Sequence, residues 1–93
     1  DKVMPENVFI ALQNTPEAQP IIEAIVADND NAVLNESPGM VKIDCPKRLV
    51  LRRETVEEKL GQEFNLQDIH LTLISLSGNI DEDEDEFVLH WDF

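Results

Sequence analysis

Two short helical patterns, each set among strand-forming runs, constrain the fold of this chain more than any other feature of its sequence. The first pattern lies between Thr15 and Asp28, and the second lies between Thr55 and Gly61. The order strand, helix, strand, strand therefore occurs twice, over about residues 8–44 and about residues 48–93. This order favours an antiparallel sheet with helices on one face. We predict a single α+β domain over residues 1–93, in which two helices cover a mainly antiparallel sheet.

The first unit begins with a strand and a helix that would cover it. Val8 to Leu12 is an apolar run rich in β-forming residues, which is typical of a buried strand. Thr15 and Pro16 are typical of an N-cap followed by proline in the first helical turn, and Pro20 predicts that the regular helix begins near it. Four apolar residues fall on one face of this helix: Ile21, Ile22, Ile25 and Val26.

Turn residues separate the strands that follow. Ser37-Pro38-Gly39 supplies turn dihedrals, so Ala32 to Glu36 and Met40 to Asp44 are predicted to form a β-hairpin. Cys45-Pro46-Lys47 is the next break. Arg48 to Arg52 alternates basic residues with leucines, which indicates a strand with one side in solvent.

The second helix and the last strands complete the second unit. Thr55 and Glu58 have the spacing of a capping box, and Gly61 is a plausible stop. Ile69 to Leu76 is the strongest strand pattern in the chain. A final strand is predicted from Glu86 to Phe93, with apolar residues alternating toward one side: Phe87, Leu89, Trp91 and Phe93.

The residue types that carry enzyme chemistry are scarce. The chain has one cysteine, two histidines and no tyrosine, and it lacks a glycine-rich phosphate loop. His70 and His90 are predicted on neighbouring strands, but a zinc site needs three or four ligands and Cys45 lies in a different loop. We therefore expect no catalytic residue, no metal site and no cofactor. A chain of this kind is expected to act on another protein.

The overall charge excludes two classes of partner. Twenty acidic residues against seven basic ones give a formal charge of −13, which repels nucleic-acid phosphates and anionic membranes. No apolar stretch approaches the ~20 residues of a membrane span. A single cysteine cannot form an internal disulfide, so the reducing cytoplasm is the expected location.

The charges are unevenly distributed along the chain. Asp81 to Glu86 is an acidic run in which Glu86 occupies the place where a calcium loop needs glycine, so we interpret it as a solvated loop. Five of the seven basic residues lie within twelve positions, either as an ordinary solvated strand face or as a docking site for an acidic partner surface. These residues are Lys42, Lys47, Arg48, Arg52 and Arg53.

Ser75 to Asn79 is the most unusual uncharged segment. Here a strand pattern ends in small polar residues and a Gly78-Asn79 pair that can adopt positive φ. The segment is explained either as a strand-to-loop turn or as a surface where small side chains let a partner's backbone approach closely. On the second interpretation, a valine in place of Gly78 would weaken the action on the partner more than folding.

Four stretches carry a resemblance to a known family: Val8 to Gln13, Pro20 to Ile25, Leu51 to Gly61, and Leu73 to Asn79 with the acids that follow. They resemble the regulatory, or coupling, proteins of bacterial multicomponent monooxygenases, the family that includes the coupling proteins of phenol hydroxylases and methane monooxygenase regulatory protein B. The resemblance runs from about Asn7 to Trp91 and is specific by its extent.

The resemblance implies a cofactor-free effector without catalytic activity. Such an effector binds the diiron hydroxylase component of a phenol-type monooxygenase, associates functionally with its NADH-dependent reductase system, and promotes coupled O2 activation and aromatic hydroxylation. It also implies that a six-residue segment faces the hydroxylase, and the basic strip adds two arginines as candidate contacts. The expected interface residues are Ile74, Ser75, Leu76, Ser77, Gly78, Asn79, Arg52 and Arg53.

Two other functions stay open at this point. A repeated β-α-β unit with a basic strand could instead be a small-ligand-sensing regulatory domain that binds an anionic metabolite. Ligand binding without any hydroxylase would favour that alternative. A weak metal-dependent enzyme is the third possibility, and it predicts stoichiometric metal in the purified protein.

Overall fold

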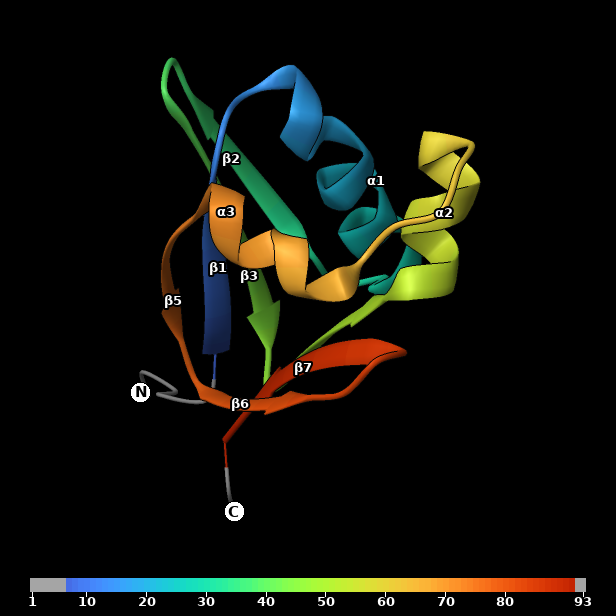
Figure 1. The fold of residues 1–93 in the computed structure, drawn as a ribbon. Coiled ribbons are helices and arrows are strands. Elements are labelled where there is room, and N and C mark those ends of the chain that lie inside the picture. Colours follow the sequence, from blue (N-terminus) through green and yellow to red (C-terminus); the bar gives the residue numbers. More distant parts are fainter. Residues whose placement is uncertain (1–6, 92–93) are drawn as a thin grey trace, which may run out of the picture.

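The computed structural model describes residues 7–91, which form seven strands and three α-helices (Figure 1). Short 3-10 turns, η1 (Pro16–Ala18) and η2 (Leu66–Asp68), lead into α1 and α3. The α-helices are α1 (Gln19–Asp28), α2 (Arg53–Leu60) and α3 (Ile69–Thr72). The strands are β1 (Asn7–Gln13), β2 (Val33–Ser37), β3 (Met40–Pro46), β4 (Arg48–Arg52), β5 (Leu73–Ser77), β6 (Asn79–Glu82) and β7 (Glu86–His90).

The strands belong to two antiparallel sheets with the orders β2-β3-β1-β5 and β4-β7-β6. The predicted α+β class, antiparallel pairing and first hairpin are confirmed. The structure differs from the prediction in dividing the strands between two sheets and in containing a third helix. The chain crosses between the sheets through the helical segment from α2 to α3, and directly at Lys47 (φ 68°), between β3 and β4, and at Gly78 (φ 131°), between β5 and β6. Left-handed backbone at these two residues interrupts the extended path and starts a new sheet.

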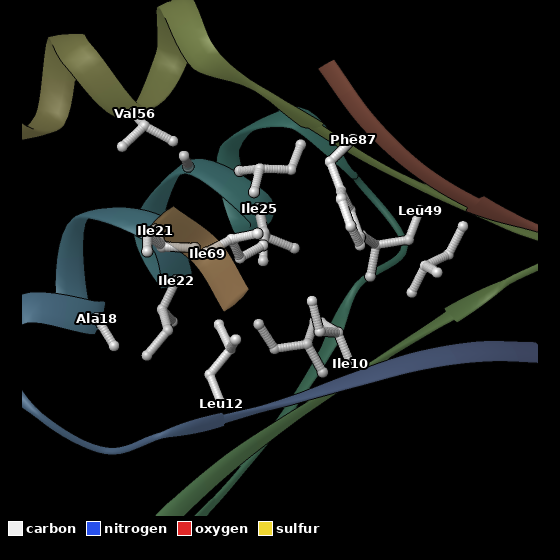
Figure 2. Close-up of a cluster of buried hydrophobic side chains, with 14 of the residues drawn as sticks. Ile10, Leu12, Ala18, Ile21, Ile22, Ile25, Leu49, Val56, Ile69 and Phe87 are labelled. Atoms are coloured by element: carbon white, nitrogen blue, oxygen red, sulfur yellow. The ribbon is translucent and has the colours of Figure 1, made fainter. Parts of the chain in front are cut away.

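The helices lie on one face of the four-stranded sheet, where the core forms (Figure 1). Ile10 and Leu12 of β1 point toward the isoleucines of α1, and these side chains are nearly or fully buried: Ile10, Leu12, Ile21, Ile22 and Ile25 (Figure 2). Burial of this apolar surface is the main stabilising contribution to the fold. Helix α2 and the inner face of the small sheet complete the same cluster through Val56, Leu49 and Phe87.

One residue of the predicted apolar helix face was misplaced. Val26 is 44% exposed, whereas Ala24 is fully buried. The buried stripe of α1 is centred on Ile21, Ile22 and Ile25, so Val26, one position after Ile25, is rotated about 100° away from it toward solvent.

The strand predicted from Ile69 to Leu76 is wrong in its first half. Ile69 to Thr72 form α3, and β5 begins only at Leu73. Ile69 and Thr72 are three positions apart and both buried, and the Thr72 hydroxyl donates to the Ile69 carbonyl oxygen at 3.2 Å. Burial on one helical face therefore prevails over the strand preference of β-branched residues.

The capping box predicted at Thr55 and Glu58 is also wrong. Helix α2 begins two residues earlier, at Arg53, and its N-cap residue Arg52 makes no side-chain cap. The Arg53 amide donates to the Asp85 carbonyl oxygen at 2.9 Å, and the Thr55 hydroxyl donates to Asp28 Oδ1 at 3.1 Å. The predicted stop is confirmed, because Gly61 adopts φ 82°.

The last strand is shorter than predicted. Strand β7 ends at His90, with Phe87 and Leu89 fully buried as expected. Trp91 lies just beyond it and donates from Nε1 to the Asn7 carbonyl oxygen at 3.0 Å. Phe93 lies outside the described residues. Within residues 7–91, no helix has the length and apolar character needed to cross a membrane.

Candidate protein-docking surface

The predicted interface segment lies where the two sheets meet. Strand β5 is an edge strand of the four-stranded sheet and pairs only with β1 among the described strands. Its register shifts between Ala11, which pairs with Ser75, and Leu12, which pairs with Leu73. Ile74 is therefore the extra residue of a β-bulge. Bulges bend a strand and redirect side chains, and they are frequent at functional sites.

The bulge gives two consecutive exposed residues in the middle of β5. Ile74 is 49% exposed and Ser75 is exposed, whereas Leu73 and Leu76 are half-buried and pack against the core cluster. A regular strand would have turned either Ile74 or Ser75 inward. The bulge thus creates a small exposed surface with one large apolar side chain and one hydroxyl.

A side chain at the position of Gly78 would point toward the core. A Cβ atom added to Gly78 would lie 2.9 Å from Val8 Cγ1, and Val8 is fully buried. The φ of 131° is also strained for any residue with a side chain. A valine at this position is therefore expected to impair folding as well, and its effect on folding relative to its effect on the partner stays a prediction. Gly78 lets the chain turn between the sheets, with exposed Asn79 immediately after it.

Arg52 and Arg53 lie at the other end of the small sheet from Asn79. In the pairing of β4, β7 and β6, Asn79 lies opposite His90, which lies opposite Arg48. Arg52 instead pairs with Glu86 at the acidic end of the hairpin. The structure therefore places Arg48, and not the two predicted arginines, in the row of Asn79.

The two predicted arginines differ in their surroundings. Arg53 Nη2 lies 3.0 Å from Asp85 Oδ1, and the Arg53 amide also bonds the Asp85 backbone, so this arginine fixes α2 to the β6–β7 turn. Arg52 is exposed on the edge strand β4. Of the two, Arg52 has the side chain that a partner can reach more freely.

The acidic run is only partly a loop. Asp81 and Glu82 belong to β6, and the turn to β7 is formed by residues 83–85. Asp83 Oδ1 accepts the amides of Asp85 at 2.8 Å and Glu86 at 2.9 Å. These backbone bonds, that from Glu86 foremost, lower the pKa of Asp83 from its ordinary value. The turn is thus a tight, internally bonded structure.

The histidines and the cysteine do not come together. His70 lies on α3, with Nε2 3.2 Å from Glu82 Oε1, while His90 lies on β7. Cys45 is buried, and this burial together with the charge of Asp44 raises the pKa of its thiol. Among residues 7–91, no group of three or more histidine, cysteine or acidic side chains is arranged to hold a metal ion.

Two pockets of the described residues have linings that do not suit an anion. A pocket of about 1080 Å³ is lined by six acidic residues and by Arg53. A second pocket, of about 500 Å³, includes Glu17, Glu63 and Asp68 in its lining. Lys42, Arg48 and Arg52 line neither pocket. The anion-sensing alternative therefore gains no support from these two pockets.

Two exposed apolar residues near the segment were missed. Leu71 is 75% exposed on α3, and Ile80 is 48% exposed on β6. Leu71 was hidden within the apparent strand from Ile69 to Leu76. In a helix, Leu71 lies on a different face from Ile69 and Thr72. The only sequence feature that pointed to the exposure of Ile80 is its position directly before the acidic run.

Comparison with known proteins gives consistent results. Residues 6–90 match the MmoB/DmpM family. The chain is 46% identical over 84 residues to the stimulatory component DmpM of phenol 2-monooxygenase from Pseudomonas sp. (strain CF600), covering 90% of this chain and 93% of that protein.

Solved structures show the same fold. A chain in a phenol hydroxylase–regulatory protein complex superposes with a TM-score of 0.88 at 42% identity, covering 92% of this chain and 99% of that chain. The soluble methane monooxygenase regulatory protein B has a TM-score of 0.74 at 19% identity, covering 99% of this chain and 71% of that chain. The latter likeness concerns the fold alone. Together with the family match over residues 6–90, the close relatives establish that this chain belongs to the MmoB/DmpM family.

Proposed function

We propose that this chain is the regulatory component of a bacterial phenol-type multicomponent monooxygenase. It binds the diiron hydroxylase component and promotes coupled O2 activation and hydroxylation of an aromatic substrate. The observation that carries the proposal is the 46% identity to a phenol 2-monooxygenase stimulatory component across 90% of the chain. The structural match to a chain in a hydroxylase–regulatory protein complex supports the same partner.

The proposed role requires no catalytic residue in this chain. A regulatory protein changes its partner by binding one conformation more tightly than another. Coupling free energies of about 1–3 kcal/mol change a population roughly five- to 150-fold. The reaction's chemistry belongs to the hydroxylase, and electrons reach it from NADH through the reductase system.

We place the main contact with the hydroxylase at Ile74 to Asn79. Ile74 and Ser75 are exposed by the bulge, and Asn79 is exposed beyond Gly78. Leu76, Ser77 and Gly78 support this surface from partly buried positions. A large apolar side chain beside small polar ones suits a protein interface that is well packed at its centre.

Arg52 and Arg53 are proposed as a separate peripheral contact. They lie beside the acidic β6–β7 turn and four strand positions from the row of Asn79, which supports a contact separate from the Ile74–Asn79 surface. Rim charges act mainly on the rate and orientation of association. With a pI of about 4.2, most of the surface of this chain is complementary to a basic partner surface. The two arginines are a local exception, because they are complementary to an acidic one.

We further propose that the protein works in the cytoplasm. Its described cysteine, Cys45, is a free buried thiol, which is compatible with a reducing compartment. NADH-dependent electron transfer takes place in that compartment as well. Fractionation of cells that express the native operon, with activity assays on each fraction, tests this placement.

The central experiment titrates the protein into a phenol-type diiron hydroxylase with its reductase. Hydroxylated product and NADH consumption are followed together. Product that rises to an optimum, with more product per NADH, is the expected result. If neither quantity changes over the titration, the proposal is overturned. Calorimetric titration with small organic anions, without hydroxylase, tests the ligand-sensing alternative on the same preparation.

A further inference from the structure

The segment proposed to contact the hydroxylase is held by few strand pairings. Strand β5 pairs with β1 through four residue pairs that the bulge interrupts, and β6 pairs only with β7 among the described strands. Three of the six exposed large hydrophobic side chains among residues 7–91 lie in the segment 74–79 or within three residues of it: Leu71, Ile74 and Ile80. The exposed side chains of this segment keep their relative positions only if the chain is held in place both before and after the segment.

A side-chain contact joins those two ends. His70 on α3 lies before the segment, and Glu82 on β6 lies after it. His70 Nε2 lies 3.2 Å from Glu82 Oε1 and 3.3 Å from Oε2. An ionised carboxylate can only accept hydrogen bonds, so Nε2 carries the hydrogen and donates it. The contact closes residues 71–81 into a loop.

The histidine ring is also placed against the core. It makes a T-shaped contact with the Phe87 ring, with centroids 6.1 Å apart and planes at 72°. Phe87 is fully buried and lies opposite Glu82 in the β6–β7 pairing. Such edge-to-face contacts have a preferred geometry. His70 is therefore fixed both to the strand that leaves the segment and to the core beneath it.

We infer that the His70–Glu82 pair is a positioning clasp for the docking segment. It holds α3 against β6 and so sets the relative placement of Ile74, Ser75 and Asn79. Neither residue needs to touch the hydroxylase for this role. The inference deepens the proposed function and rests on it for its effect on regulation, while the effect on the free protein stands independently.

Four variants separate positioning from general stability. His70→Gln and Glu82→Gln each weaken the clasp, and the double variant H70E/E82H restores the pair with its members exchanged. Glu84→Gln is the matched control, because it removes the same charge from an exposed position in the same hairpin. Thermal unfolding of all four checks that they are folded at the assay temperature.

The first readout is hydrogen–deuterium exchange of the free protein over residues 73–80. One exposed side-chain hydrogen bond contributes little to stability, so we expect roughly two- to fivefold faster exchange in each single variant. The exchanged pair should slow exchange again, and Glu84→Gln should match the wild type. Unchanged exchange in both single variants, or no recovery in H70E/E82H, would overturn the clasp.

The second readout is stimulation of a phenol hydroxylase at saturating regulatory protein. We expect lower maximal stimulation by both single variants, recovery in H70E/E82H and no loss with Glu84→Gln. Full stimulation by both single variants would overturn the regulatory effect of the clasp. Wild-type protein that neither binds nor stimulates the hydroxylase would instead overturn the proposed function. Whatever the stimulation assay shows, hydrogen–deuterium exchange tests independently whether the clasp positions the segment in the free protein.

Discussion

The side chain of Asn29 bonds both backbone polar groups of Val50, as a neighbouring strand would. Asn29 Nδ2 donates to the Val50 carbonyl oxygen at 2.7 Å, and Asn29 Oδ1 accepts the Val50 amide at 2.9 Å. The same Nδ2 donates to the Ile25 carbonyl oxygen at 2.6 Å, at the end of α1. One amide group thus joins the first helix to edge strand β4.

Removing this amide should destabilise the protein. In Asn29→Ala, part-buried backbone groups of Val50 and Ile25 lose their partner, which costs about 1–3 kcal/mol. Urea unfolding measures the free energy of unfolding. Asn35→Ala is the control, because Asn35 makes an exposed bond to Asp44 at 3.2 Å and its loss should cost much less. Equal losses in the two variants would contradict this account of Asn29.

Gly78→Ala should impair folding itself. The added methyl group would meet Val8 Cγ1 at 2.9 Å and would force a side chain into φ 131°. We expect a loss of about 1–3 kcal/mol in the free energy of unfolding, from the backbone strain alone. Gly39→Ala provides the comparison, since its Cβ would have no atom within 4 Å. Chemical denaturation of both variants tests this, and a Gly78→Ala protein as stable as Gly39→Ala would refute it.

Ile74→Ser should weaken hydroxylase binding while preserving the fold. The side chain is 49% exposed in the bulge, so its loss removes little core packing, whereas a central apolar contact in an interface is worth more than about 1 kcal/mol. We expect the dissociation constant to rise roughly tenfold. Val33→Ser tests the opposite edge of the same sheet with a side chain 56% exposed. If both variants bind like the wild type, Ile74 is outside the interface.

Arg52→Glu should slow association with the hydroxylase. A rim charge of the wrong sign acts on the association rate, by a few-fold at low salt, and reduces its dependence on ionic strength. Stopped-flow or surface-binding measurements at two salt concentrations give both quantities. Lys59→Glu reverses another exposed charge at the far end of α2. Identical rates and salt slopes for wild type and Arg52→Glu would show that the arginine is merely solvated.

Cys45 should make the protein less stable in alkaline solution. Burial of its side chain, 1% exposed, and then the charge of Asp44 raise its pKa in the folded state. As the pH rises, the thiol therefore loses its proton in the unfolded state before it does in the folded state. The stabilising contribution of the protonated thiol is complete below the pKa of the unfolded state and is lost as the pH rises through the pKa of the folded state. Unfolding followed between neutral pH and pH about 10 should show a steeper loss for wild type than for Cys45→Ala. Parallel curves would contradict the shift.

The parts of the fold that were predicted correctly depend on local chemistry. The Ser37-Pro38-Gly39 turn, the alternation in Arg48 to Arg52 and the stop at Gly61 are set by the residues at those positions. Helix α3 was missed because Ile69 and Thr72 are β-branched and favour a strand, and the segment becomes helical through the burial of these two residues on one face. That burial depends on tertiary packing, which a local pattern does not contain.

The sequence predicted which residues make up the candidate site, but not which of them are exposed or how they lie relative to one another. The exposure of Ile74 depends on the register between β5 and β1, two strands far apart in sequence. The separation of Asn79 from Arg52 likewise depends on the pairing of β4 and β6 with β7. His70 was assigned to a strand, so its contact with Glu82 could not be foreseen.

The chain passes directly from a strand of one sheet to a strand of the other at Lys47 and at Gly78, and the second of these crossings has a consequence for binding. Ser77 ends one sheet and Asn79 begins the other, with only Gly78 between them. A partner that contacts both Ser75 and Asn79 contacts both sheets. Its affinity therefore depends on the angle between the two sheets. Repacking of the buried core around Phe87 and Leu49 would then alter regulation without any substitution in the contact surface itself.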